Sequence, residues 1–372
     1  MSITVNPDLI REIKKYGAFD ISACFQCGNC TAVCPLSSEN GSFPRKLIRY
    51  GQLGARDRIV GSIEPWLCYY CGECSQTCPR EAEPGEYMAA LRRYSIAACE
   101  PTGLGKLMYM SGLVMLTVTL ILGAIFAGFM AVVKSGDNPS SWLFGSVSYN
   151  TIHWLGIAAG ILSMLAFLGG LARMVRGMSK DMPEPKPGIK QVKKALIATL
   201  IEVITLRRHR GKPEDTVGPA YLQASVVHKA IFYGFMGLLA ATTLDLIFLE
   251  LLPLHLTIFW PARIIGTISG VSMLYGVIAA ILRRTKKLEK NVSKTALSDA
   301  WLLGFLLLLA ITGFYLEIMV TLRMVSPTND MVLLVHSAMA MELVMLVAFT
   351  KLAHAVYRPL ALFFYSLKGG EL

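Results

Sequence analysis

The chain has 372 residues, of which 54% are hydrophobic, and its formal net charge is +11. Residues 1–106 carry 12 Lys and Arg against 11 Asp and Glu, so the positive surplus does not form an N-terminal basic patch, which argues against nucleic-acid binding. The chain also lacks a Walker loop, a nucleophile elbow and a dinucleotide fingerprint, so nucleotide and flavin chemistry must reside on other proteins.

Two cysteine runs of identical spacing lie near the N-terminus: C-F-Q-C-G-N-C-T-A-V-C-P at residues 24–35 and C-Y-Y-C-G-E-C-S-Q-T-C-P at residues 68–79. The spacing C-x2-C-x2-C-x3-C-P is typical of proteins with two 4Fe-4S clusters, in which three close thiolates bind one cluster and the fourth binds the other. The rule assigns Cys24, Cys27, Cys30 and Cys78 to cluster 1, and Cys68, Cys71, Cys74 and Cys34 to cluster 2.

Zinc and disulfide bonds are the alternatives for these eight cysteines. Zinc sites usually combine distant C-x2-C pairs rather than three cysteines within seven residues. No secretory signal pattern precedes Cys24, and the loop charges described below place this segment in the reducing cytoplasm, so we expect no disulfides. Cys99 is predicted to be a buried small residue, with a redox role as the alternative.

The spacer between the runs, F-P-R-K-L-I-R-Y-G-Q-L-G-A-R-D-R-I-V, contains helix formers. Pro44 is expected at a helix start, and Gly51 and Gly54 are expected to break the helix. Small bacterial ferredoxins place their cysteines on hairpins rich in β-branched residues instead. We therefore predict an all-α protein whose residues 1–103 form a cytoplasmic helical ferredoxin domain with two 4Fe-4S clusters.

Residues 104–372 are predicted to form a six-helix transmembrane bundle, because a buried core helix rarely needs such long apolar segments repeatedly. The connections at 173–221 and 283–296 and the tail after 357 carry 11, 6 and 2 Lys or Arg, whereas the other three connections carry 1, 0 and 1. This bias places both termini in the cytoplasm. The predicted spans are 107–133, 149–172, 222–250, 262–282, 297–320 and 331–357.

The connection at 173–221 is too long for a turn and contains a predicted amphipathic helix at about 183–211. Apolar residues recur there at helical spacing, with Lys190, Lys193 and Lys194 on the opposing side. Such a helix is expected to lie on the inner lipid headgroups, or alternatively against a partner protein.

Four of the six histidines fall within predicted spans, in two depth-matched pairs. His153 and His336 each lie about one turn into a span that begins outside, whereas His228 and His354 lie near the inner surface. A polar ring is costly in hydrocarbon, so we interpret the pairs as axial ligands of two haem b groups. His336 and His354 are about five turns apart and would share one face of a continuous helix. The absence of C-x-x-C-H excludes covalent c-type haem.

These motifs resemble two protein families. The doubled cysteine run with P-R-K-L-I-R-Y-G-Q-L-G between resembles the small iron–sulfur subunit of heterodisulfide reductases, and the membrane part resembles the cytochrome b subunit of respiratory nitrate reductases. In that cytochrome family the last helix supplies two haem ligands, matched by His336 and His354. An earlier helix supplies two more; His228 matches one, but Leu238 occupies the other position and cannot ligate. His153 has the right depth to replace it.

The fusion of both modules resembles the membrane subunits of the quinone-modifying oxidoreductases of sulfate-reducing microbes. The resemblance implies an enzyme subunit of the inner membrane that passes electrons between menaquinol and cytoplasmic proteins through two haems b and two 4Fe-4S clusters. The implied partners are two flavin-binding heterodisulfide-reductase-like subunits and adenylylsulfate reductase. The alternatives are a non-catalytic membrane anchor and electron relay, or the equivalent subunit of a heterodisulfide reductase or another sulfur-metabolism complex.

The quinol site is predicted beside the outer haem, near the connection L-L-P-L-H-L-T-I-F-W-P-A-R. His255 is expected to accept a proton, and Arg263 to bind a quinone oxygen as it gains negative charge. Nitrate reductase relatives carry a basic side chain at about this position. Alternatively, both are interfacial residues, or the site lies at the inner leaflet near His228 and Lys229. A transporter is a further alternative, with an ion path marked by Asp245, Glu317 and Glu342.

Overall fold

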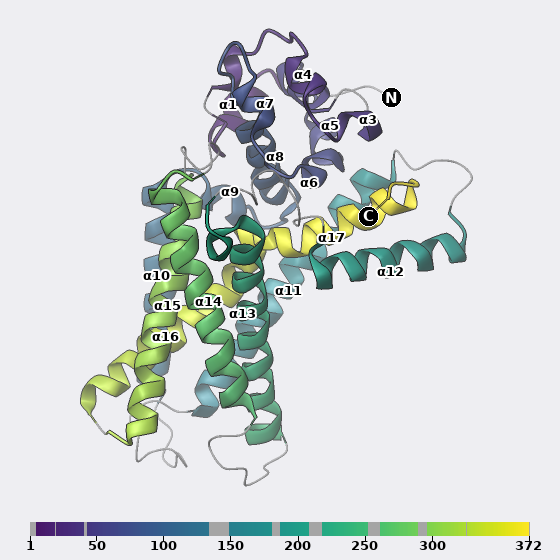
Figure 1. The fold of residues 1–372 in the computed structure, drawn as a ribbon. Coiled ribbons are helices and arrows are strands. Elements are labelled where there is room, and N and C mark those ends of the chain that lie inside the picture. The colour runs from purple at the N-terminus through teal and green to yellow at the C-terminus, as the bar shows by residue number, and fades with distance from the viewer. Residues whose placement is uncertain are drawn as a thin grey trace.

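The computed structural model shows a domain of short helices seated on one end of a bundle of long helices (Figure 1). All regular elements in the described part of the chain are helices, which confirms the predicted all-α fold class. The structure describes residues 5–18, 20–40, 43–133, 149–180, 187–207, 218–251, 261–288, 296–324 and 326–371.

The N-terminal domain is organised around α8 (Pro84–Cys99), a helix buried along most of its length. Its Tyr87 and Leu91, one turn apart, are fully buried in one hydrophobic core with Leu9 and Ile13. The surrounding helices are α1 (Leu9–Lys14), α2 (Asn29–Ala32), α3 (Ser37–Asn40), α4 (Arg45–Gln52), α5 (Arg56–Val60), α6 (Glu64–Leu67), α7 (Glu73–Gln76) and α9 (Leu104–Met108).

The spacer between the cysteine runs is helical, as predicted, and α4 begins directly after Pro44. Gly54 follows the helix with a left-handed φ of 70°, which confirms it as a break. Gly51 does not break the helix and lies within α4. A Cβ there would collide with the Tyr87 hydroxyl, so this glycine permits close packing of α4 on α8.

Six helices of the described residues are long and apolar enough to cross a membrane, which confirms the predicted number of spans. Their observed lengths follow from the same apolar runs, because a helix that crosses a bilayer needs about 20 residues. The six helices are α10 (Gly112–Val132), α11 (Tyr149–Ser179), α13 (Ala224–Asp245), α14 (Ala262–Thr285), α15 (Leu297–Leu322) and α16 (Pro327–Leu346).

The sixth predicted span is not a continuous helix, so the expectation that His336 and His354 share one helix face is wrong. Helix α16 ends at Leu346, two 3-10 turns follow, and α17 (His354–Leu367) runs across the bundle direction (Figure 1). Thr350 is extended (φ −114°, ψ −176°), which interrupts the helical hydrogen bonds. The break is stabilised by an ion pair of Lys351 with a distant carboxylate.

That carboxylate is Asp299 of α15, which is 8% exposed and joins the domain to the bundle. Lys351 Nζ lies 2.8 Å from one carboxylate oxygen, and Arg93 Nη2 of α8 lies 3.3 Å from the other. A second contact between the two parts is made by the rings of Trp66 (α6) and Tyr357 (α17), which stack with centroids 5.8 Å apart. One hydrophobic core thus continues across the predicted boundary at residue 103, and that boundary stays a prediction.

An Arg93→Met protein is expected to have a weaker connection between domain and bundle. Arg93 is buried and also donates to the Tyr16 carbonyl at 2.7 Å, so its removal leaves that buried carbonyl without its donor and should lower the free energy of unfolding by about 1–3 kcal/mol. The measurement is the temperature at which detergent-solubilised protein becomes protease-sensitive. Arg11→Met is the control, because the Arg11–Asp8 pair is exposed and should contribute little. Equal transition temperatures in both variants would contradict a structural role for Arg93.

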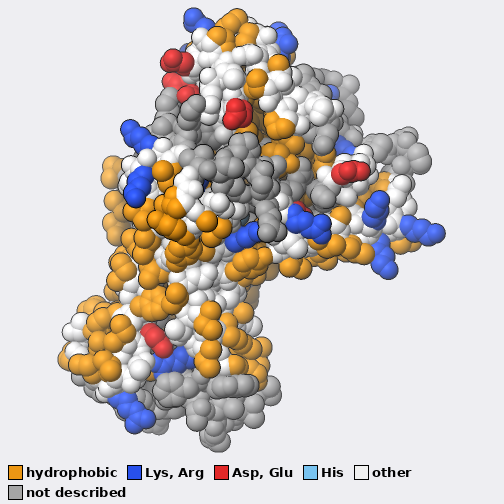
Figure 2. Space-filling model, viewed as in Figure 1, with side chains coloured by type: hydrophobic (Ala, Val, Ile, Leu, Met, Phe, Trp, Pro, Cys, Tyr) orange, Lys and Arg blue, Asp and Glu red, His pale blue; other side chains and the backbone are white. Residues whose placement is uncertain are grey.

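The predicted amphipathic helix is present as α12 (Ile189–Thr205); the ends of the expected range, 183–186 and 208–211, lie outside the described residues. It packs alongside α17, roughly at right angles to the bundle (Figure 1). Ala195 and Thr199 are buried, whereas Leu196 and Leu200 are about half exposed. Figure 2 shows hydrophobic side chains along the lower side of the part that projects from the bundle, where α12 and α17 lie. Such an apolar face is suited to lipid.

Candidate redox-cofactor sites

The two cysteine runs adopt the same backbone turn. Gln26 and Tyr70, two residues after the first cysteine of each run, have φ of 65° and 64°. Gly28 and Gly72 follow with φ of 89° and 85° and begin the short helices α2 and α7. Glycine adopts this left-handed conformation without a steric cost, so the C-G-x-C sequence can wrap its cysteines around one point.

The second run forms a cavity together with one cysteine of the first run. Its lining includes Cys34, Cys68, Cys71 and Cys74, the four residues assigned to cluster 2. Burial raises the pKa of the Cys34 thiol, and the nearby charges of Cys68 and Cys71 raise it further. Cys34 therefore lies among the cysteines of the opposite run.

The first run shows the reciprocal arrangement. Burial raises the pKa of the Cys30 thiol to about 11, and the charges of Cys24, Cys27 and Cys78 add to this effect. Thiolates crowded in this way repel one another, and bound iron supplies the positive charge that keeps them deprotonated. The donor set and its surroundings thus fit two 4Fe-4S clusters with exchanged fourth ligands, although the residue assignment stays a prediction.

Backbone amides point at two of these sulfurs. The amide of Tyr70 donates to Cys68 Sγ and that of Ala82 to Cys78 Sγ, both at 3.4 Å. Such bonds tune the reduction potential of a cluster. Within the described ranges no three His, Cys, Asp or Glu side chains converge on a single ion. A 4Fe-4S cluster does not require such a convergence, because its four irons are separate and are bound by four cysteines. Cys99 is 1% exposed, which confirms its predicted burial.

His228 of α13 and His354, the first residue of α17, face each other with ring centroids 6.4 Å apart. We call them the proximal pair, because they lie at the end of the bundle next to the N-terminal domain. Two imidazoles that bind one iron at about 2 Å each place their centroids about 6 Å apart. His354 Nδ1 lies 2.6 Å from the Lys351 carbonyl, to which it must donate, so Nε2 remains for a metal.

His336 and His153, the distal histidines, lie towards the other end. His336 Nδ1 is 2.8 Å from Thr312 Oγ1, which again leaves Nε2 for a metal. A Cβ on Gly313 would come within 3.1 Å of this ring, so the glycine makes room for it. One apolar cluster contains Ile152, which adjoins His153, together with Leu334 and Ala338, each two residues from His336, so the two histidines lie at similar depth. His153 also interacts electrostatically with Asp245 of α13. Coordination of one iron by His153 and His336 stays a prediction.

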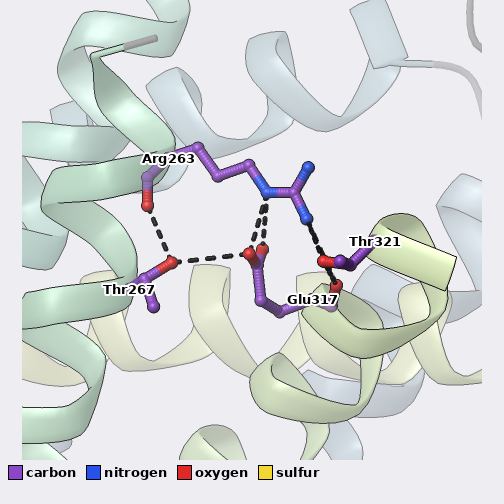
Figure 3. A network of polar contacts seen from close by, with 4 residues as sticks. All are labelled: Arg263, Thr267, Glu317 and Thr321. Carbon is purple, nitrogen blue, oxygen red and sulfur yellow. Dashed lines mark hydrogen bonds and ion pairs between the residues drawn. The ribbon is translucent and has the colours of Figure 1, made fainter. Parts of the chain in front are cut away.

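Arg263, predicted to bind a quinone oxygen, pairs with Glu317 of α15 (Figure 3). Its Nε donates to both carboxylate oxygens at 2.8 and 3.0 Å, and its Nη2 donates to Thr321 Oγ1 at 2.6 Å. Thr267 Oγ1 completes the network at 3.4 Å from the carboxylate. This pair was not predicted from the sequence, although opposite charges inside two apolar spans were its signal. His255 lies outside the described residues.

The comparisons with known proteins concern the N-terminal domain. Residues 20–82 match the family model of the 4Fe-4S dicluster domain. The chain is 31% identical over 71 residues to an iron-sulfur subunit of the CoB–CoM heterodisulfide reductase of Methanopyrus kandleri, covering 17% of this chain and 37% of that protein. It is 32% identical over 63 residues to a subunit of the H2:CoB–CoM heterodisulfide,ferredoxin reductase of Methanothermobacter thermautotrophicus, covering 17% of this chain and 34% of that protein.

The chain thus spans about a third of the length of the curated relatives it matches. No solved structure matches it. Together with the cysteine geometry, these similarities establish an iron–sulfur electron-transfer domain related to the iron–sulfur subunit of heterodisulfide reductases, attached to a multi-pass membrane domain.

Proposed function

We propose that this chain is the membrane subunit of a quinone-linked oxidoreductase that passes electrons between menaquinol and cytoplasmic flavin and iron–sulfur proteins. The observation that carries the proposal is the proximal pair, His228 and His354, placed directly beside the dicluster domain. Haem b and 4Fe-4S clusters each carry one electron at a time, so a two-electron donor can feed a one-electron chain. On this proposal the domain lies in the cytoplasm, and the proximal pair lies at the inner membrane surface.

A connected set of side chains links the proximal pair to the second cysteine run. Lys351 accepts the His354 hydrogen bond through its carbonyl and binds Asp299 through its ammonium group. Arg93 binds the same carboxylate, and its neighbour Arg92 donates to the Cys68 carbonyl at 2.9 Å. Cluster 2 is therefore the better placed to exchange electrons with the proximal haem site. Because Cys27 is exposed, cluster 1 is better placed to reach a soluble partner.

The quinol site is best placed at Glu317 and Arg263 near the distal histidines. Glu317 is five residues beyond Thr312, the hydrogen-bond partner of His336, or about 7.5 Å along α15. Quinol oxidation releases two protons and two electrons, and the Glu317 carboxylate is suited to accept a proton. Arg263 holds that carboxylate in place through two hydrogen bonds from Nε. An inner site near His228 and Lys229 is the rival.

Menaquinol added to the purified protein is expected to reduce haem with a change in the optical spectrum. A Glu317→Gln protein with unchanged haem content should react at least about tenfold more slowly, because the proton acceptor is gone. The control is Arg323→Gln, which removes an exposed charge at the end of the same helix. A wild-type protein without haem would contradict the proposed function. Unchanged rates in Glu317→Gln and Arg263→Met would instead remove the distal quinol site.

The similarity to the iron–sulfur subunits of heterodisulfide reductases favours a complex with other subunits of that type, and we propose the two flavin-binding ones as partners. Adenylylsulfate reductase is the proposed acceptor, and a heterodisulfide reductase or related sulfur-metabolism complex is the alternative. A chain that serves only as anchor and relay would contain haem that menaquinol does not reduce. Identification of the proteins that co-purify with the solubilised chain distinguishes the acceptors.

A further inference from the structure

Positive charge gathers around the proximal pair. Lys351 and Arg358 flank His354 along the chain, three residues before it and four residues after it. Arg358 is four residues after His354 on α17, so both side chains project from the same face of that helix. Lys351 precedes the helix and is tied to His354 through its carbonyl. Two cations thus approach the site from one segment of the chain.

Asp299 carries one negative charge but contacts three positively charged side chains. Lys351, Arg93 and Arg284 all lie within 2.8–3.8 Å of its two carboxylate oxygens. Arg93 and Asp299 are almost completely buried, whereas the Lys351 side chain retains 36% of its exposure. One carboxylate compensates one cation, so among the described side chains in contact with Asp299 a surplus of positive charge remains. Glu86, the other described carboxylate that acts on Arg93, hydrogen-bonds to Tyr70, and burial raises its pKa, so it is a weak source of negative charge.

Surplus positive charge is costly in a region of low dielectric, and a further anion would remove that cost. Haem b carries two propionate carboxylates at one edge of its ring. We propose that Lys351 and Arg358, reinforced by the surplus charge at Asp299, bind the propionates of the haem held by His228 and His354. This inference rests on the proposed haem site and adds the residues that orient the haem and raise its affinity.

The test uses full-length Lys351→Met and Arg358→Met proteins, purified with their native cofactors. Haem content and the two haem midpoint potentials are measured by optical redox titration. Loss of a cation disfavours the added electron, so the proximal midpoint should shift to lower potential while the distal midpoint stays unchanged. The proximal wave is identified as the one missing from a His354→Ala protein. Lys351→Arg should restore the wild-type potential, and Lys368→Met, at the far end of α17, should leave both waves unchanged.

The inference fails if both methionine variants keep the wild-type proximal potential and haem content, or if both waves shift together. It also fails if an anionic lipid co-purifies with the wild type and is lost from the variants without a change in either wave, because lipid phosphates would then be the ligands. Retained iron–sulfur signals in electron paramagnetic resonance show that the variants fold. Wild-type protein without haem would defeat the proposed function itself, whereas intact haem with unshifted waves defeats only this inference.

Discussion

A Cys34→Ser protein is expected to lose or distort the cluster held by Cys68, Cys71 and Cys74, while the cluster of its own run persists. The reason is that Cys34 lies in the cavity formed by the second run. A hydroxyl is a poor substitute for a soft thiolate. The wild type should contain about eight cluster irons beyond haem iron, since each of two clusters holds four, and the variant about half of them.

Electron paramagnetic resonance assigns the loss to one cluster. The Cys34→Ser spectrum should match that of Cys71→Ser and differ from that of Cys27→Ser, and Cys78→Ser should behave as Cys27→Ser does. Cys99→Ser serves as the control, because Cys99 is buried apart from both runs and should leave both signals intact. If Cys34→Ser disturbs only the cluster of Cys24, Cys27 and Cys30, the fourth ligands are not exchanged.

Replacement of His354 by Gly is expected to remove the proximal haem and leave the distal one reducible by menaquinol. His354 faces His228 across a gap that fits one iron, and its Nδ1 is already engaged by the Lys351 carbonyl. The absolute haem content should therefore fall by about half, since one of two bis-histidine sites is lost. Added imidazole should restore the proximal haem, because it refills the ligand position without changing the chain.

The corresponding change at the other end tests the pairing of the distal histidines. A His153→Ala protein should lose the distal haem and with it the menaquinol-driven reduction of both haems, because electrons would enter at that end. Retention of both haems would show that His153 is not a ligand, and its interaction with Asp245 would then be its structural role. A His336→Ala protein should show the same loss as His153→Ala, because His336 is the other proposed ligand of the distal haem and Thr312 already orients its ring.

Local sequence determined much of this protein. The cysteine spacing and the glycine in each C-G-x-C segment specify the two wrapped turns, because these depend on conformations within a few residues. The six spans follow from the length of each apolar run, which must match the bilayer whatever the neighbouring helices do. The amphipathic pattern likewise predicted α12, although its contact with α17 could not be foreseen.

Contacts between distant segments decided the rest. The apolar run after residue 331 favours one long helix, yet Lys351 pairs with Asp299, 52 residues away, and the chain breaks at Thr350. Arg263 pairs with Glu317, 54 residues later, and this ion pair was not predicted, whereas the binding of a quinone oxygen by Arg263 stays a prediction. Propensity and hydrophobic length act over a few turns of chain, whereas an ion pair in a low-dielectric interior depends on which helices meet, and that is a property of the tertiary structure.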